Sequence, residues 1–496
     1  MNRRDFLKLT GLLTASAAVP QWLFRPGLQT AQGQNVLVVV FDTFSASNIS
    51  LYGYKRKTTP NIDRLAERAT VFHHHYAGGN FTTPGTATLL TSVLPWTHGA
   101  VGINDIVIDA YADKSLFHAF PYHRMAYSHN ILANTLLKDF FSGMEGLTPR
   151  EKLYLQSDAL INILFQKDED IAEVSWRRAL KRQLEGYSYS LFLAPLYERN
   201  KTKSVAALED QFPRGLPVMV DDNFFLLEDG INWALGQLDN APQPFLGYYH
   251  FNPPHDPYHT RIDFVGKFSN DGLRPPNKPQ HIFSGDRNTQ KLLEWRQEYD
   301  EFILYVDSEF ARLFDFLESQ GILKNTWLVL TSDHGEMFER GIGGHRSKVL
   351  YQPVIHIPLL IFAPGQQTRQ DVYDVTSAID VLPTLAHLTN QPAPAWTQGL
   401  VLPPFSDQRT VRDVFSLQVE GKDDNGGINN ATVAMMRENY KLIYYFGYEE
   451  LEGGEMVELY DVEADPEELD DLSPSRQELT NQLLSALKKK LEEVAP

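Results

Sequence analysis

The chain has 496 residues, of which 43% are hydrophobic and 12% aromatic, and a formal net charge of −18. This composition allows one large α/β domain with a smaller appendage, excludes a disordered or fibrous protein, and argues against nucleic acid as a partner. The chain contains no cysteine, which excludes disulfides, zinc–thiolate sites and a thiol nucleophile.

Residues 1–33 are predicted to be an export signal and linker. Residues 2–8 (NRRDFLK) contain paired arginines, and an apolar stretch over residues 9–19 follows them. This order is typical of a twin-arginine signal, and the apolar stretch is short for a membrane span. We therefore expect recognition by the twin-arginine export machinery and a periplasmic or other extracytoplasmic location. An uncleaved signal anchor is the alternative, and no later segment has the pattern of a transmembrane helix.

Buried strands and helices alternate through residues 34–410. The apolar runs typical of strands buried on both faces are residues 36–41, 245–251, 327–330 and 359–362. Helical patterns cover residues 59–69, 84–92 and 292–320, and Pro60 occupies the first helical position of the first pattern. This alternation predicts an α/β domain with a largely parallel sheet.

Two other segments depart from this alternation. Residues 145–235 carry basic and aromatic helical pieces, which predict a helical insertion near the substrate entrance; an ordinary amphipathic packing layer is an equal alternative. Residues 411–496 are predicted to form a C-terminal subdomain. It would contain antiparallel strands at residues 440–446 and 457–462 and a terminal helix at residues 474–493.

Polar residues follow two of the predicted strands. Asp42 comes directly after residues 36–41, and Asp333 and His334 come shortly after residues 327–330. In an open α/β sheet the functional crevice lies at the carboxyl ends of the strands, so these side chains are expected to converge. A lone Asp after a strand is usually a turn or cap residue. Two such positions with an adjacent His instead indicate a mixed oxygen and nitrogen site for a divalent cation.

Thr82 is the candidate nucleophile. In residues 80–86 (NFTTPGT), Pro84 is expected to open a helix that Thr83 caps, which would place Thr82 just outside the helix N-terminus. Free N–H groups and the helix dipole stabilise an anion there, and a hydroxyl next to a metal ion can attack phosphorus or sulfur. Turn and cap roles for Thr82 and Thr83 are the alternative, which spacing alone does not exclude.

A series of short motifs from residue 34 to about 475 resembles the sulfatase family in order and spacing. The motifs are Asp42-Thr43, Tyr52-Gly53-Tyr54, residues 59–66 (TPNIDRLA), Thr82-Thr83-Pro84, residues 89–91 (LLT), His98-Gly99, residues 254–258 (PHDPY), residues 332–336 (SDHGE), Gly344-His345 with Lys348, residues 379–384 (IDVLPT), residues 437–442 (RENYKL), residues 458–461 (ELYD) and residues 465–468 (DPEE). The resemblance implies an alkaline-phosphatase-like α/β/α fold in three layers with a small C-terminal subdomain.

The resemblance also implies roles for individual residues. The implied ligands of one divalent metal ion are Asp42, Thr82, Asp333 and His334. Lys348 and His255 would contact the anionic oxygens or the leaving group of the substrate, and His255 could act as the general acid. The weaker candidates for substrate binding are His345, Asn80 and His129. His255-Asp256 does not reproduce the Asp-x-x-x-His pattern of relatives with two zinc ions, so one metal ion is expected.

Three positions depart from the pattern of sulfatases proper. Those enzymes carry a Cys or Ser that becomes formylglycine at the position of Thr82, and an Arg at the position of Thr86. Oxidation of a threonine would give a ketone rather than the required aldehyde, so we expect no formylglycine. Thr43 stands where many sulfatases have a second Asp for calcium. The ligand set therefore favours Zn²⁺ or Mn²⁺, with Ca²⁺ or Mg²⁺ as alternatives.

Threonine nucleophiles are typical of phosphodiesterases and of relatives that transfer phosphoethanolamine or glycerophosphate. The sequence therefore predicts a hydrolase of phosphate diesters or phosphonate esters that works through a covalent intermediate on Thr82. The expected substrate is an anionic ester, either a small molecule or linked to a lipid or glycan. A sulfuric ester hydrolase, a transferase and a non-catalytic anion-binding protein are the alternatives. The absence of later transmembrane patterns favours hydrolysis over a lipid-linked transfer.

Overall fold

The computed structural model of the chain describes residues 33–103, 105–153, 199, 203, 206–217, 224–285, 287–406, 411–422 and 427–494. The predicted signal, up to residue 32, and most of the predicted helical insertion lie outside these residues. Among the described residues, no helix combines the length and apolar character needed to cross a bilayer.

A central sheet of eight strands has the order β10-β2-β9-β6-β1-β5-β3-β4. Its strands are β1 (Asn35–Phe41), β2 (Thr70–Tyr76), β3 (His123–Ser128), β4 (Gly146–Leu147), β5 (Phe245–Phe251), β6 (Thr326–Thr331), β9 (Leu359–Phe362) and β10 (Gln370–Ser377). Paired strands are parallel, except that β9 runs antiparallel to both β2 and β6. The prediction of a largely parallel sheet is confirmed.

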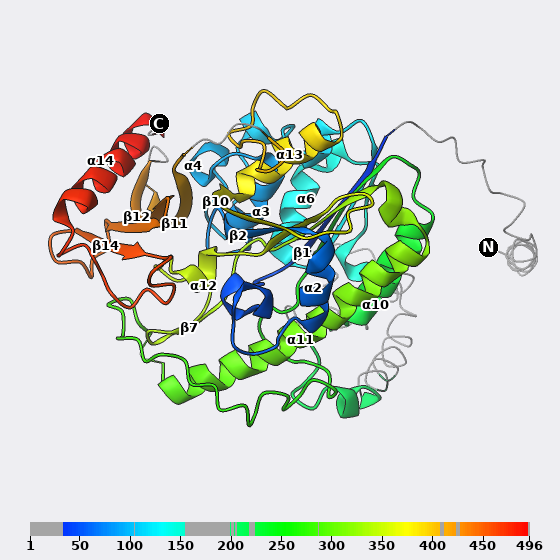
Figure 1. The fold of residues 1–496 in the computed structure, drawn as a ribbon, viewed down its shortest axis with the longest axis horizontal. Helices are drawn as coiled ribbons and strands as arrows, with labels where there is room; N and C mark the ends of the chain where they lie inside the picture. Colours follow the sequence, from blue (N-terminus) through cyan, green and yellow to red (C-terminus); the bar gives the residue numbers. More distant parts are fainter. Residues whose placement is uncertain are drawn as a thin grey trace, which may run out of the picture.

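Helices cover both faces of this sheet (Figure 1). One face packs on α10 (Leu227–Asp239) and α11 (Thr289–Ser319), together with α2 (Pro60–Leu65). The other face packs on α3 (Thr82–Thr91), α6 (Ile131–Asp139) and α13 (Val381–Leu388). Leu37 and Val39 of β1 belong to the first core, whereas Val36 and Val38 belong to the second. Because successive side chains of a strand point to opposite faces, a strand covered on both sides is apolar throughout.

The smaller elements complete the large domain. They are the helices α4 (Pro95–His98), α5 (Leu116–Ala119) and α12 (Gln352–Ile355), and the hairpin of β7 (Met337–Glu339) and β8 (Ile342–Gly344). The predicted helix at residues 59–69 is α2 followed by a 3-10 turn at Ala66–Arg68. The predicted helix at residues 292–320 begins three residues earlier, where the side chain of Asn288 accepts a hydrogen bond from the backbone N–H of Gln290.

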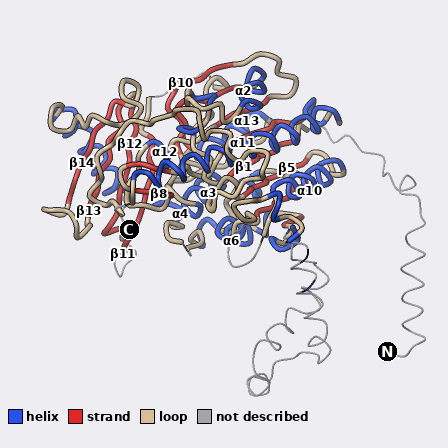
Figure 2. Tube along the Cα trace, turned by 90° about the horizontal axis from the view of Figure 1, so that it is seen from below, coloured by secondary structure: helices blue, strands red, loops and turns tan. Residues whose placement is uncertain are grey.

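A second, antiparallel sheet forms the C-terminal subdomain, at the orange and red end of Figure 1. Its strands follow one another in the order β11 (Val414–Lys422), β12 (Ile428–Arg437), β13 (Tyr440–Phe446) and β14 (Glu455–Asp461). The terminal helix α14 (Gln477–Val494) packs Leu483 and Leu487 against this sheet. Figure 2 shows the subdomain beside the large domain. The backbone N–H of Leu417 in β11 donates a hydrogen bond to the carbonyl of Gly78 in the large domain.

Candidate active site

Three predicted ligands converge where β1 and β6 end. Asp42 follows β1, and Asp333 and His334 follow β6, its neighbour in the sheet. The Nε2 atom of His334 lies 3.3 Å from Oδ1 of Asp42 and 3.6 Å from Oδ2 of Asp333. One donor atom from each residue lies within 4.8 Å of the others, and all three side chains are buried. The predicted convergence of these residues is confirmed.

The hydroxyl of Ser332, in the loop after β6, holds this loop to the loop after β1. The hydroxyl of Ser332 donates a hydrogen bond to the carbonyl of Phe41 over 2.7 Å and accepts one from the backbone N–H of Phe44 over 2.9 Å. The helix α3 packs closely against the loop after β6 at Gly85. A Cβ atom on Gly85 would lie only 2.2 Å from the carbonyl oxygen of Asp333. Only glycine allows this approach, which brings the start of α3 to the metal-ligand candidates.

Thr82 lies at the start of α3, facing these residues. Its Oγ1 is 3.5 Å from Oδ2 of Asp42 and 3.5 Å from Nε2 of His334. The structure makes Thr82 the first helical residue rather than the residue before the helix, and the cap position belongs to Phe81, which has no capping side-chain bond. The expected cap role of Thr83 is therefore wrong; its hydroxyl instead bonds the carbonyl of Ile103 over 3.4 Å. Thr82 still lies in the first turn, where backbone N–H groups are free of helical partners.

Burial and neighbouring charges shift the pKa values of Asp42, Asp333 and His334. Burial disfavours ionisation of Asp42, but hydrogen bonds from His250 and His334 hold its pKa well below the usual value. Burial and the charge of Asp42 together raise the pKa of Asp333. Burial opposes protonation of His334, yet the charges of Asp333 and Asp42 raise its pKa to about 9. Two buried carboxylates therefore require a cation between or beside them.

These residues fit a divalent metal ion. Oγ1 of Thr43 is buried without a hydrogen-bond partner, and Oδ1 of Asp42 is buried with Nε2 of His334 at 3.3 Å, so both oxygens could serve as metal ligands. Nδ1 of His334 lies 3.0 Å from the carbonyl of Gly335. A carbonyl can only accept, so Nδ1 carries a proton, and a metal ion bound in place of the Nε2 proton would meet the lone pair of His334 on Nε2. Thr43 has a φ of 59°, a rare conformation for a β-branched residue that marks functional sites.

Two residues that the sequence did not suggest also reach Asp42. Asn130 donates from Nδ2 to Oδ2 of Asp42 over 2.5 Å and lies 3.5 Å from Oγ1 of Thr82. His250 places Nε2 at 3.3 Å from the same carboxylate oxygen. The available signals were weak: an Asn at the start of a helical pattern is usually a cap, and a His inside an apolar strand run is usually a packing residue.

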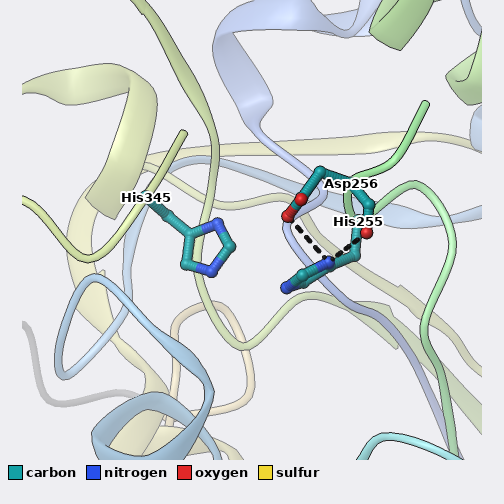
Figure 3. A group of neighbouring side chains, drawn as sticks. All are labelled: His255, Asp256 and His345. Carbon is teal, nitrogen blue, oxygen red and sulfur yellow. Dashed lines mark hydrogen bonds and ion pairs between the residues drawn. The ribbon is translucent and has the colours of Figure 1, made fainter. Parts of the chain in front are cut away.

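Two further histidines, His255 and His345, lie close to each other, with Asp256 next to His255 (Figure 3). The rings of His255 and His345 have centroids 4.8 Å apart, and His345 lies 4.6 Å from the ring of His334. Nδ1 of His255 is 2.7 Å from the carbonyl of Asp256, and Nδ1 of His345 is 3.2 Å from both carboxylate oxygens of the buried Glu336. Because both Nδ1 atoms face acceptors, the Nε2 atoms are left for a ligand. Burial lowers the pKa of His255, but the charges of Asp42, Asp256 and Glu336 outweigh it and raise that pKa.

The other predicted substrate contacts have different surroundings. Lys348 forms an ion pair with Glu450 over 2.5 Å and lies over the rings of Phe283 and Tyr448. Asn80 donates to the carbonyl of Ser347 over 2.6 Å. It thereby fixes the loop that carries His345.

His129 is buried and stacks on Phe225, with ring centroids 3.4 Å apart. Burial and the neighbouring His250 hold its pKa well below the usual value, so the ring is neutral. The adjacent Asn130, rather than His129, reaches Asp42. Substrate contacts by Lys348, Asn80 and His129 stay predictions.

Comparisons with known proteins identify the family of the chain. The profile of the family described as "Sulfatase" matches residues 34–137 and 185–391, which is more than half of the chain. The chain belongs to the sulfatase family. A second profile, described as "N-sulphoglucosamine sulphohydrolase, C-terminal", matches residues 343–495. The resemblance seen in the sequence is thereby confirmed.

Three named relatives share a quarter of their residues or less with this chain. Arylsulfatase K of Canis lupus familiaris is 24% identical over 51% of this chain and 52% of its own, so the chain spans about half the length of that relative. The uncharacterized sulfatase YidJ of Escherichia coli is 25% identical over 88% of this chain and 82% of its own. The multifunctional alkaline phosphatase superfamily protein PehA of Trinickia caryophylli is 23% identical over 89% of this chain and 91% of its own.

Solved structures of the family show the fold. A 2-O GAG sulfatase superposes with a TM-score of 0.64 at 18% identity, covering 93% of both chains. The phosphonate monoester hydrolase of Agrobacterium radiobacter superposes with a TM-score of 0.63 at 18% identity, covering 93% of this chain and 95% of its own. The chain therefore has the alkaline-phosphatase-like α/β fold that the sequence predicted.

Proposed function

We propose that this chain is a metal-dependent hydrolase of phosphate diesters or phosphonate esters that works through a covalent intermediate on Thr82. One observation carries the proposal: an unmodified threonine hydroxyl lies 3.5 Å from both Asp42 and His334 at the start of a helix. Threonine cannot become formylglycine, which supports the unmodified Thr82 oxygen as the nucleophile. Sulfatase-family neighbours include a phosphonate monoester hydrolase, which supports this substrate class.

The ligands of the ion would be Asp42, Asp333, His334 and Thr82. The ion would supply positive charge that lowers the pKa of the Thr82 hydroxyl and offsets charge on the transferring group. A donor set with one imidazole favours Zn²⁺ or Mn²⁺, with Ca²⁺ or Mg²⁺ as alternatives. Asn130 would hold Asp42 and Thr82 in register through its amide.

The reaction would proceed in two displacements. Thr82 Oγ1, having lost its proton to solvent, attacks phosphorus and forms a Thr–O–P bond while the bond from phosphorus to the leaving oxygen breaks. His255 donates its Nε2 proton to that leaving oxygen. Water then gives a proton back to His255, attacks phosphorus and breaks the Thr–O–P bond, and the released Thr82 oxygen regains a proton from solvent. His345, held by Glu336, would bind an anionic oxygen of the substrate.

A sulfuric ester hydrolase is the main alternative, because the relatives named above include sulfatases. Transfer of phosphoethanolamine or glycerophosphate to an alcohol acceptor is another alternative. A non-catalytic anion-binding protein is least favoured, because Asp42, Thr82 and His334 are all in place. The substrate would be a small or a lipid- or glycan-linked anionic ester, and the twin-arginine pattern supports export to the periplasm.

Paired aryl substrates separate these functions. The purified chain, loaded with Zn²⁺ or Mn²⁺, would be assayed with a phosphate diester, a phosphonate monoester, a phosphate monoester and a sulfate ester, beside the Thr82→Ala variant. We expect the diester or the phosphonate to have the highest kcat/KM and all turnover to vanish in Thr82→Ala. A dominant sulfate ester activity would instead establish the sulfatase alternative.

A further inference from the structure

Asn252 lies directly after β5, at the same edge of the central sheet as Asp42. Phe251, the last residue of β5, pairs in register with Phe41, the last residue of β1. Asn252 and Asp42 therefore follow neighbouring parallel strands. The backbone N–H of Asp42 donates to the carbonyl of Phe251 over 2.9 Å, which holds the two strand ends together. Only 6% of Asn252 is exposed, so its side chain is a buried polar group at the edge that carries the metal-ligand candidates.

The backbone of Asn252 is bonded to two histidines. Its N–H donates to Nε2 of the buried His129 over 3.2 Å, and its carbonyl accepts from the backbone N–H of His255 over 2.9 Å. The second bond joins the first and fourth residues of a turn. One turn therefore carries both Asn252 and His255, the proposed general acid.

The hydrogen bonds of Asn130 fix which end of the Asn252 amide faces it. Oδ1 of Asn130 accepts from the backbone N–H groups of Leu132 and Ala133, so its Nδ2 points the other way. This Nδ2 lies 3.3 Å from the side chain of Asn252. An amide nitrogen can only donate, so the atom of Asn252 that faces it is Oδ1.

This orientation leaves the NH₂ group of Asn252 as a free donor. Among the residues that the structure describes, no acceptor bonds to this group. Native proteins rarely leave a donor of a buried side chain without an acceptor, and an ester bound at this site would bring anionic oxygens. The nucleophile is near, because Nδ2 of Asn130, which donates to Asn252, lies 3.5 Å from Oγ1 of Thr82.

We propose that Asn252 donates from Nδ2 to a non-bridging oxygen of the transferring group and stabilises the charge on that oxygen while Thr82 attacks. A donor whose orientation is already fixed needs no reorganisation during the reaction, so it can stabilise the transition state. The proposal rests on the proposed function and deepens it by naming a further catalytic residue. The amide would act in the same way on an oxygen bound to phosphorus or to sulfur.

Two variants separate donation to the substrate from support of Asn130. Asn252→Asp keeps an oxygen that can accept from Asn130 but loses the NH₂ group, whereas Asn252→Ala loses both. The full-length, zinc-loaded variants would be assayed with the aryl ester that the wild type turns over fastest. We expect kcat to fall about 10²–10³-fold in both variants. Asn252→Ala should keep the zinc affinity of the wild type, measured by chelator competition, and its circular dichroism spectrum.

A kcat near the wild-type value in either variant would overturn the proposal. Weaker zinc binding in Asn252→Ala would overturn it as well and make Asn252 a support for Asn130 and Asp42. The Thr82→Ala variant tests the proposed function separately. If Thr82→Ala keeps its turnover while both Asn252 variants lose theirs, the Thr82 nucleophile is wrong and the donor role of Asn252 stands. A wild type that turns over none of the four esters would reject both.

Discussion

The side-chain amide of Asn130 donates a hydrogen bond to Oδ2 of Asp42 over 2.5 Å. Its Oδ1 accepts from the backbone N–H groups of Leu132 and Ala133, over 2.8 and 3.2 Å, as the cap of α6. The capping bonds fix the orientation of the amide, so its NH₂ group must face the carboxylate. One residue therefore ties the start of a helix to a candidate metal ligand.

Substitution of Asn130 separates these two roles. Asn130→Ala should lower stability by about 1 kcal/mol through loss of the cap and should also reduce kcat/KM. Asn130→Ser keeps a capping oxygen but is too short to reach Asp42, so it should keep the stability and lose the activity. Urea unfolding and steady-state kinetics measure the two effects. Full activity in the Ser variant would show that the bond to Asp42 has no part in turnover.

The pH dependence of kcat/KM should report His255. The nearby acids raise its pKa above the usual value of 6.5 despite burial, so the protonated general acid persists to higher pH. Activity should therefore fall on the alkaline side, as pH rises through this raised pKa. His255→Gln should remove that fall and slow alkyl esters by about 10²–10⁴-fold, with less effect on nitrophenyl esters.

Asp256→Asn provides the control for this profile. Removal of one of the charges that raise the pKa of His255 should move the alkaline limb to lower pH without removing it. An alkaline limb that is unchanged in both variants would assign the proton to another group.

Lys348 is paired with Glu450 in the structure, so a substrate anion would compete with this carboxylate for the lysine. Ion pairs between exposed residues contribute at most about 1 kcal/mol, so an anionic ester could compete for the lysine. Lys348→Met should raise KM for anionic esters at least tenfold and leave Tm nearly unchanged, whereas Glu450→Gln should leave KM equal or lower. Equal kinetics in the wild type and Lys348→Met would exclude the predicted contact.

Metal removal should destabilise the fold. Asp42 and Asp333 are buried carboxylates at one site, and an ion that binds only the folded chain stabilises it by about 2.7 kcal/mol at 100 times its Kd. A chelator should therefore lower Tm, and Zn²⁺ or Mn²⁺ should restore it. Asp333→Asn should respond less to both treatments, and a Tm that no chelator changes would argue against a bound ion.

The local sequence pattern predicted the buried strands of the central sheet. Strands covered on both faces are continuous apolar runs, so β1, β5 and β6 could be placed, and the polar residues Asp42 and Asp333 marked their ends. The direction of β9 could not be predicted, because burial on both faces is the same for a parallel and an antiparallel strand.

Long-range contacts account for what sequence reasoning missed. Asn130 lies 88 residues from Asp42 along the chain and His250 lies 208 residues from it, and each has an ordinary local role, as a cap and as a strand residue. Lys348 was placed by a motif, but its ion pair with Glu450 joins residues 102 apart. The motifs identified the ligand types, whereas the fold alone decides which neighbours share their site.

The covalent intermediate on Thr82 is the central claim, and trapping it is the most direct test. The metal-loaded enzyme would be mixed with excess phosphate diester, quenched in acid during turnover, digested, and its peptides analysed by mass spectrometry. We expect a phosphoryl ester on Thr82 that is absent without substrate and absent from Thr82→Ala. Turnover of the diester with an unmodified Thr82 peptide at every quench time would contradict it.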